Sequence, residues 1–118
     1  MLVYGFLKEK AGFMEIGDSL EEMELFVGGK IEKTALTDHI DLICNEMGML
    51  LGLEPRVIFY ENGKAVNAII LGDCVVCRHD EKGNLKSIHK EDEKFIKERL
   101  FHLTQEKLAL LGMLFLLS

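Results

Sequence analysis

The stretch DSLEEMELFVGG, residues 18–29, is the most fully specified element of the sequence. Ser19, followed three residues later by Glu22, has the pattern of a capping box, in which each side chain accepts a hydrogen bond from the other residue's backbone N–H. The apolar residues that follow recur at helical spacing. Gly28 and Gly29 then end the pattern, at a place where a left-handed residue is favoured. The stretch therefore predicts a helix that begins after Ser19 and ends at Gly28.

Segments typical of β-strands lie on both sides of this helix, which indicates an α+β fold. Before the helix, residues 2–8 and 13–16 are predicted to form a hairpin around a turn at 11–13. After the helix, residues 45–55 are predicted to form a loop or a single helical turn. The later strands are expected at 30–36, 41–44, 56–60, 65–71, 72–79 and 85–88, with a tight turn at Asn62-Gly63.

The C-terminal part is predicted to be helical. Phe95, Ile96, Leu100 and Leu103 form one apolar stripe, and Thr104 is expected to cap a second helix. Residues 108–117 are apolar on all sides, so we expect that helix to be buried in the core or against another chain.

These elements predict a single domain, residues 1–118. Residues 1–88 would form a mostly antiparallel sheet of five to seven strands with one helix after the first hairpin. Residues 89–118 would add a C-terminal helix or helix pair, packed on or beside the sheet.

The stretch GDCVVCRHD, residues 72–80, resembles a metal or redox motif because Cys74 and Cys77 form a C-x-x-C pair. On a strand, however, residues three apart point to opposite faces, so the two thiols would not chelate one ion. We therefore expect buried free thiols and no metal. Cys77 and His79 do share a face, and with Cys44 from another strand they form an alternative three-ligand set.

The charge distribution is uneven. The net charge is −6, which argues against direct nucleic-acid binding, because phosphate contacts need clustered Lys and Arg. Residues 1–54 hold 11 acids and 4 bases, whereas residues 55–118 hold 9 acids and 10 bases. An acidic field over the first half would steer a basic partner towards it. The plain alternative is a solvated acidic face.

Other patterns narrow the functional class. The N-terminus lacks the basic region of a signal peptide, and the longest apolar run is too short to span a membrane, so we expect a cytoplasmic protein with reduced thiols. There is no G-x-S-x-G, no P-loop and no G-x-G-x-x-G, and the histidines lack the i, i+4 spacing of a zinc helix. We therefore expect no enzyme activity and no cofactor.

Three stretches carry a resemblance to a known family: GDSLEEMELFVGGKIE (17–32), DLICNEMGMLLGLEPR (41–56) and AIILGDCVVC (68–77). The segment from Gly17 to about Asp80 resembles a family of small uncharacterised proteins found in bacteria and on their phages and mobile elements. The sequence departs from the family pattern at Pro55, where the family has Asn before the Arg. The region from about His89 onward lies outside the resemblance. The resemblance implies a small accessory protein without a known enzymatic activity.

We therefore expect a non-enzymatic binding protein of phage or mobile-element origin that inhibits a host defence complex, as an anti-CRISPR or anti-restriction protein does. It would occlude a basic nucleic-acid-binding surface of a host protein or nucleoprotein complex. The residues expected to bind this partner are Asp18, Glu21, Glu22 and Glu24, together with Asn45, Glu46 and Arg56 in a polar loop site.

Two alternatives remain open. In the first, the protein is a self-associating scaffold module, and the C-terminal helix forms a dimer interface through Leu110, Met113, Leu114 and Leu117. In the second, it is a hydrolase or metal enzyme that uses Cys77, His79 and Glu46.

Overall fold

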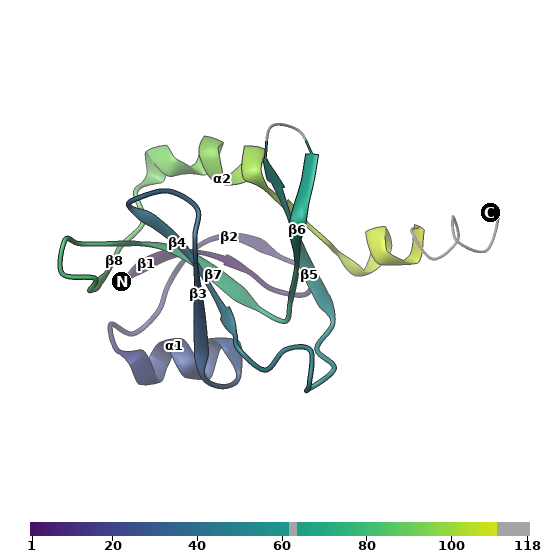
Figure 1. Ribbon diagram of the computed structural model, residues 1–118, viewed down its shortest axis with the longest axis horizontal. Helices are drawn as coiled ribbons and strands as arrows, with labels where there is room; N and C mark the ends of the chain where they lie inside the picture. The colour runs from purple at the N-terminus through teal and green to yellow at the C-terminus, as the bar shows by residue number, and fades with distance from the viewer. Residues whose placement is uncertain (62–63, 111–118) are drawn as a thin grey trace.

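The structure, a computed structural model, describes residues 1–61 and 64–110. Within these residues the chain forms an α+β fold with two antiparallel sheets, which confirms the predicted fold class (Figure 1). The elements are, in chain order, β1 (Leu2–Phe6), β2 (Ala11–Glu15), α1 (Leu20–Val27), β3 (Ile31–Ala35), β4 (Ile40–Asn45), β5 (Pro55–Glu61), β6 (Lys64–Leu71), β7 (Cys74–His79), β8 (Leu85–Lys86), the 3₁₀ helix η1 (Lys90–Asp92), α2 (Glu93–Arg99) and β9 (Leu100–His102).

The strands divide between two sheets rather than forming the single sheet that we expected. The larger sheet has the order β2-β1-β7-β4-β3, with the short β8 added beside β7. The smaller sheet has the order β6-β5-β9. All of these pairings are antiparallel, and β7, which comes late in the chain, lies between β1 and β4.

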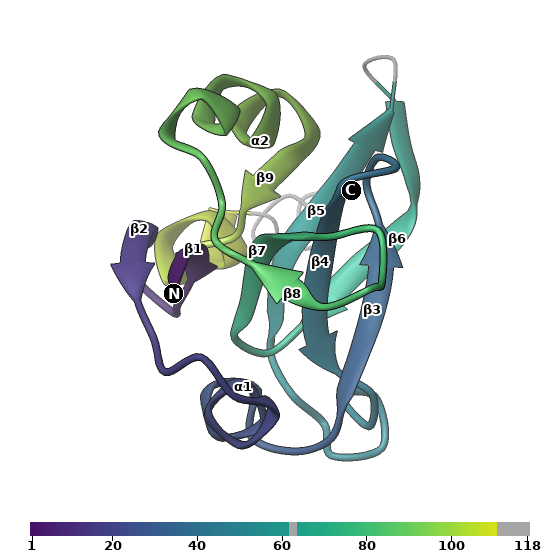
Figure 2. The same cartoon turned by 90° about the vertical axis from the view of Figure 1, so that its left-hand side faces the viewer.

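The central strand β7 is covered on both faces, because its side chains alternate between two hydrophobic clusters. Cys74 and Val76 face the larger cluster, which includes Ile96 of α2 and residues of the second sheet. Val75 and Cys77 face the smaller cluster, which includes the buried side chains of α1. Helix α1 therefore packs on one face of the main sheet, while α2 and the second sheet cover the other (Figure 2).

The predicted boundaries of α1 are confirmed by the hydrogen bonds at its ends. The Glu22 backbone N–H donates to Ser19 Oγ at 3.2 Å, which satisfies a donor of the first turn. At the other end, Gly28 has φ 82° and donates its N–H to the Glu24 carbonyl at 2.8 Å. This left-handed conformation costs glycine little because it has no Cβ.

Two local predictions were wrong. Residues 11–13 belong to β2, where Gly12 pairs with Gly5, and the turn lies before them, closed by a bond from Leu7 N to the Lys10 carbonyl. The helix expected to run through Leu100 ends at Arg99, because residues 100–102 leave the helix and pair with β5 as β9. The segment predicted to be wholly helical thus contributes a strand to the second sheet.

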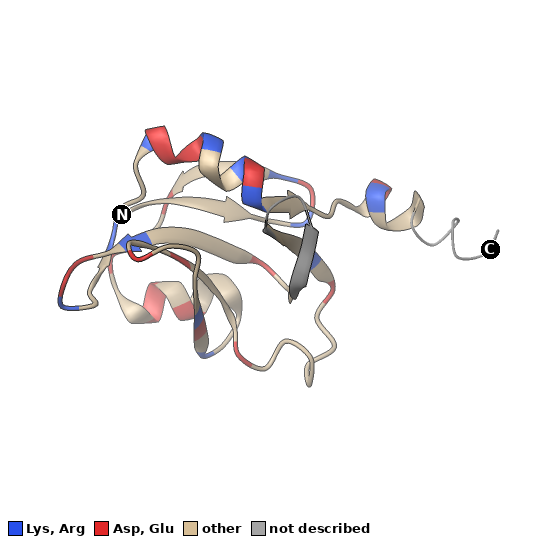
Figure 3. Ribbon diagram, turned by 45° about the horizontal axis from the view of Figure 1, so that its top comes forward, with Lys and Arg blue, Asp and Glu red and all other residues tan. Residues whose placement is uncertain are grey.

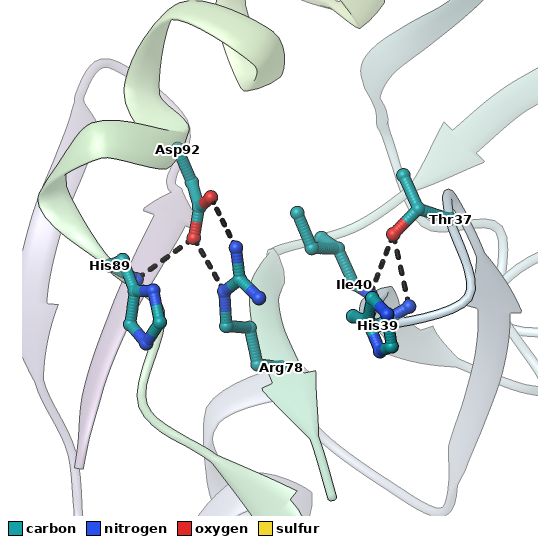
Figure 4. A network of polar contacts seen from close by, with 6 residues as sticks. All are labelled: Thr37, His39, Ile40, Arg78, His89 and Asp92. Carbon is teal, nitrogen blue, oxygen red and sulfur yellow. Dashed lines mark hydrogen bonds and ion pairs between the residues drawn. The ribbon is translucent and has the colours of Figure 1, made fainter.

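The start of α2 is tied to the main sheet by one ion pair (Figure 4). Arg78 of β7 donates from Nε and Nη2 to the two carboxylate oxygens of Asp92, at 2.8 and 2.6 Å. Asp92 also accepts from the His89 backbone N–H at 2.9 Å. The hydrogen bond from Arg78 holds the pKa of Asp92 below its ordinary value, and the bond from His89 lowers this pKa further by a smaller amount. Partial burial acts in the opposite direction.

Candidate functional site

The acids predicted to bind a partner gather on and just before α1. Asp18, Glu21 and Glu22 are exposed, and Glu24 is half-buried. We refer to these four residues as the acidic face. The Glu22 side chain folds back over Gly17, where an added Cβ would clash with Glu22 Cγ. The acids of the first turn also suit the positive end of the helix dipole, which explains part of their presence.

Several acids elsewhere in the fold are paired with a basic group, whereas the acidic face is not paired within the described residues. Asp41, Asp73, Asp80, Asp92 and Glu93 each lie within 4.0 Å of a basic nitrogen. Among the described side chains, no member of the acidic face has such a partner. Figure 3 shows acidic residues in red along α1, whereas α2 carries interleaved acids and bases. In the described part of the chain, the unpaired acids of the first half therefore include all four members of the acidic face, together with Glu9, Glu32, Asp38 and Glu46.

The three residues of the predicted loop site do not act together. Asn45 is buried and structural: its Nδ2 donates to the Val27 carbonyl at 3.1 Å, and its Oδ1 accepts from Met47 N at 2.8 Å. Glu46 is exposed. Arg56 is buried and donates from Nε to Asp73 Oδ1 at 3.0 Å. Asn45 thus joins the end of α1 to the loop after β4 and is not available to a ligand.

Arg56 instead lines a shallow pocket of about 450 Å³. The pocket lies between the end of α1, represented by Phe26 and Gly28, and residues Gly52 and Glu54 of the loop after β4. Arg56 Nη1 is buried and has no hydrogen-bond partner among the described atoms. Because Arg56 is paired with Asp73, the buried guanidinium does not give the pocket a strong positive charge.

A feature that the sequence analysis missed lies beside this pocket. Met47, Met49, Leu50 and Leu51 are between 42% and 85% exposed, and we refer to them as the apolar loop. The stretch was predicted as a loop or a single helical turn, with no role in binding. The signal was present in its composition, because MGMLLGL is an apolar run in a place where turn residues are usually polar. Exposed apolar groups that gather in this way mark interaction sites.

The alternative three-ligand set does not form. Cys77 faces the α1 side of the main sheet, whereas Cys44 faces the opposite side together with Cys74. This confirms that Cys74 and Cys77 point to opposite faces. Within residues 1–61 and 64–110, no group of three or more His, Cys, Asp or Glu side chains is placed to hold a metal ion.

The chemistry of the thiols fits a core role. All three cysteines are free and buried. Burial raises the pKa of Cys44 to about 11 and that of Cys77 to about 12, and it raises the pKa of Cys74 as well. Nucleophilic and redox-active cysteines need the thiolate near neutral pH, which these positions disfavour.

His79 has a defined partner of its own. Its Nδ1 lies 2.7 Å from Oδ2 of the buried Asp41, and the pair links β7 to β4. Glu46, the third residue of the enzyme alternative, lies in the exposed loop after the end of β4. Cys77 and His79 lie instead beside Asp41, near the start of β4, because Asp41 is the register partner of Cys77 and the hydrogen-bond partner of His79. The residues of the enzyme alternative are therefore not brought together.

The predicted dimer interface falls mostly outside the described residues, since Met113, Leu114 and Leu117 lie beyond residue 110. Thr104 caps the helical segment 105–110, as predicted, by accepting from Lys107 N at 3.3 Å. This segment extends away from the two sheets (Figure 1), and Leu110 at its end is 54% exposed. Leu103 is the last buried residue before it. In the part of the chain that is described, no helix is long and apolar enough to span a membrane.

Comparison with known proteins agrees with the resemblance noted above. A family model described as "Domain of unknown function (DUF3846)" matches residues 7–101. The chain belongs to this family. The matched region extends beyond the resemblance that we noted, because it includes η1, α2 and most of β9. No curated protein and no solved structure matches the chain.

Proposed function

We propose that this member of the DUF3846 family is a non-enzymatic binding protein whose acidic face docks on a basic surface of a host protein or nucleoprotein complex. One observation carries the proposal: four carboxylates gather on and just before the short helix α1, and none of them has a basic partner among the described side chains. Unpaired surface charges of one sign create a field that steers and orients a partner of opposite charge.

The partner that we propose is a defence nuclease complex of the CRISPR or restriction type. The DUF3846 protein, of phage or mobile-element origin, would bind this complex in the cytoplasm and inhibit it. The physical support is that such enzymes hold nucleic acid in basic channels, which an acidic protein surface is able to occlude. The net charge of −6 fits this and disfavours direct nucleic-acid binding. The origin and the class of partner rest on the family resemblance.

The test is a pull-down from a bacterial lysate supplemented with CRISPR nucleases and restriction enzymes, at low and moderate salt, with mass spectrometry of what is retained. We expect a nuclease or nucleoprotein that is retained at low salt and released by salt, because the attraction is screened. The variant Asp18→Lys/Glu21→Lys should bind this partner at least about tenfold more weakly, since two charges of the acidic face change sign.

The matched control is Glu91→Lys/Glu98→Lys, which changes the net charge equally but alters exposed acids of η1 and α2, on the opposite face of the main sheet from α1. It should retain the partner, and circular dichroism should show that both variants are folded. Equal loss of binding in both variants would mean that only the overall charge matters. Recovery of the bait alone would contradict the proposal and favour self-association.

Self-association is the second candidate function, and the exposed end of the 105–110 helix favours it. The sequence continues from Leu110 as an apolar run to Leu117, so a second copy would remove this surface from water. In that arrangement the segment would join two protomers and would not complete the core of one.

A truncation after Thr104 separates these roles. We expect the shortened chain to remain folded, with its free energy of unfolding changed by less than about 1 kcal/mol, because the described residues after Thr104 are exposed or half-buried. Urea unfolding and sedimentation velocity would measure this. If the full-length chain is a dimer and the truncated chain is a monomer, the interface role of the segment is supported. Unfolding of the truncated chain would place the segment in the core.

A further inference from the structure

The apolar loop is held firmly, so its exposed side chains are a fixed feature of the fold. Asn45 Oδ1 accepts from Met47 N, and two backbone bonds close the loop, from Leu51 N to the Met47 carbonyl and from Leu53 N to the Gly48 carbonyl, both at 2.9 Å. Its inner side packs on the end of β6, since a Cβ at Gly48 would lie 3.1 Å from Leu71 Cβ. The outward side chains therefore have no alternative position in the core.

The apolar loop adjoins the C-terminal end of α1, the helix that carries three members of the acidic face. Asn45 bonds both the Val27 carbonyl and Met47 N, so it fixes the loop against the end of α1. The loop after β4 and α1 lie at the same end of the molecule in both views (Figures 1 and 2). On α1 itself, Leu25 is 76% exposed and lies one helical turn after Glu21. Acidic and apolar groups thus share one surface.

The charges of this surface indicate what covers it. Glu54 lies 3.9 Å from Lys8, and Asp73 is paired with Arg56, so these charges are balanced locally. Glu46 and Lys30 are both exposed and add one charge of each sign beside the loop, since the Glu46 backbone N–H donates to the Lys30 carbonyl at 2.9 Å. Asp18 lines a pocket that Lys33 and Lys86 also line, so the remaining negative charge is that of Glu21, Glu22 and Glu24. These three have no basic nitrogen within 4.0 Å among the described side chains.

We infer that the apolar loop and the acidic face together bind a basic amphipathic segment of the partner protein, whose apolar side chains cover Met47, Met49, Leu50 and Leu51 while its Lys and Arg face α1. Methionine side chains adapt to apolar groups of different shapes, which suits such an interface. An anionic lipid surface fits poorly, because it would repel the same carboxylates. This inference rests on the proposed function, since it specifies how the basic partner is anchored.

Three synthetic peptides of equal length test the inference on the full chain by fluorescence anisotropy at low salt. The first has leucines at helical spacing with lysines between them, the second replaces leucine by serine, and the third replaces lysine by glutamate. We expect the leucine-lysine peptide to bind at least about tenfold more tightly than either of the others, since it alone matches both halves of the surface.

Variants locate the binding. Met49→Ser/Leu50→Ser should weaken binding of the leucine-lysine peptide by about tenfold or more and leave the serine-lysine peptide unchanged. Ile69→Thr is the control, because Ile69 is an exposed apolar residue of the second sheet, 60% exposed. It should bind like the wild type. Asp18→Lys/Glu21→Lys should weaken binding of both lysine peptides.

The outcomes separate the two proposals. Equal binding of the two lysine peptides, or no effect of Met49→Ser/Leu50→Ser, would overturn the inference and leave the acidic docking function standing. Failure of both lysine peptides to bind would overturn both. Association with phosphatidylcholine vesicles, or a dimer abolished by the loop variant, would assign the apolar loop to a membrane or to a second copy and overturn the inference.

Discussion

Replacing Asn45 by alanine is expected to lower the free energy of unfolding by about 2–4 kcal/mol, measured by urea denaturation. The side chain is 4% exposed and uses both its donor and its acceptor. Alanine would leave the Val27 carbonyl and Met47 N without these bonds in a site that water does not reach easily. The loss would also release the loop after β4 from α1.

The control for this prediction is Asn84→Ala. Asn84 is exposed, and its side chain donates to Asp80 at 3.2 Å, so its loss should cost only about 0.5 kcal/mol. The variant Asn45→Asp adds a second check. It removes the donor and places a carboxylate beside the C-terminal end of α1, which carries no basic residue in its last turn. If the Asn45 and Asn84 variants unfold at the same urea concentration, the connecting role of Asn45 is wrong.

The second large effect is expected from Asp92→Asn, which should lower the free energy of unfolding at pH 7 by about 2–4 kcal/mol. Asp92 holds Arg78 through two charged bonds and caps the start of η1 through His89 N. The asparagine has the same shape but leaves the half-buried Arg78 without its counter-charge. Glu93→Gln is the control, since its i, i+4 pair with Lys97 is largely exposed and is worth little.

The pH dependence of this pair has a defined sign. The pKa of Asp92 lies below its ordinary value of 3.8 in the folded state, mainly through the Arg78 bond. A carboxyl group with a lowered pKa stabilises the fold fully above its unfolded pKa and loses this contribution as the pH falls through its folded pKa. The difference between wild type and Asp92→Asn should therefore be constant near neutral pH and shrink below pH 3.8. A difference that stays constant down to pH 2 would contradict the assignment.

The elements that the sequence predicted well are those whose signals are local. Ser19 and Gly28 mark the ends of α1 within the helix itself, and the alternation in GDCVVCRHD places Cys74 and Cys77 on opposite faces without knowledge of the neighbouring strands. The hairpin of β5 and β6 likewise depends on adjacent segments, and its antiparallel pairing is confirmed.

The elements that were predicted wrongly depend on partners far along the chain. Leu100 and Leu103 continue the helical spacing of α2, but β9 forms because the edge of β5, some 40 residues earlier, offers backbone bonds. The sequence does not show how strongly that edge competes with one more helical turn. In the same way, Gly12 suggested a turn, yet its place opposite Gly5 in the β1–β2 pair makes it a strand residue.

The candidate site shows the same division. The acids around α1 could be singled out because charge is visible residue by residue, and their role in binding stays a prediction. Arg56 was predicted to bind a partner together with Asn45 and Glu46, and in the structure it lines a pocket without them. Asn45 was predicted to bind a partner but is a structural residue, because its burial depends on how the end of α1 meets β4. The apolar loop was overlooked, because only the folded arrangement shows that these leucines and methionines point outward.

The position of β7 has a consequence for how the protein is made. Strands β1 and β4 are synthesised early, but β7 lies between them, so the two halves of the main sheet are not joined until residue 79 has left the ribosome. Until then the nascent chain presents two strand edges that can pair wrongly with other chains. Because the joining contacts are distant in sequence, the sheet is expected to assemble slowly and in one late step. A nascent chain that stops before Cys74 would lack the strand that joins the two halves of the main sheet.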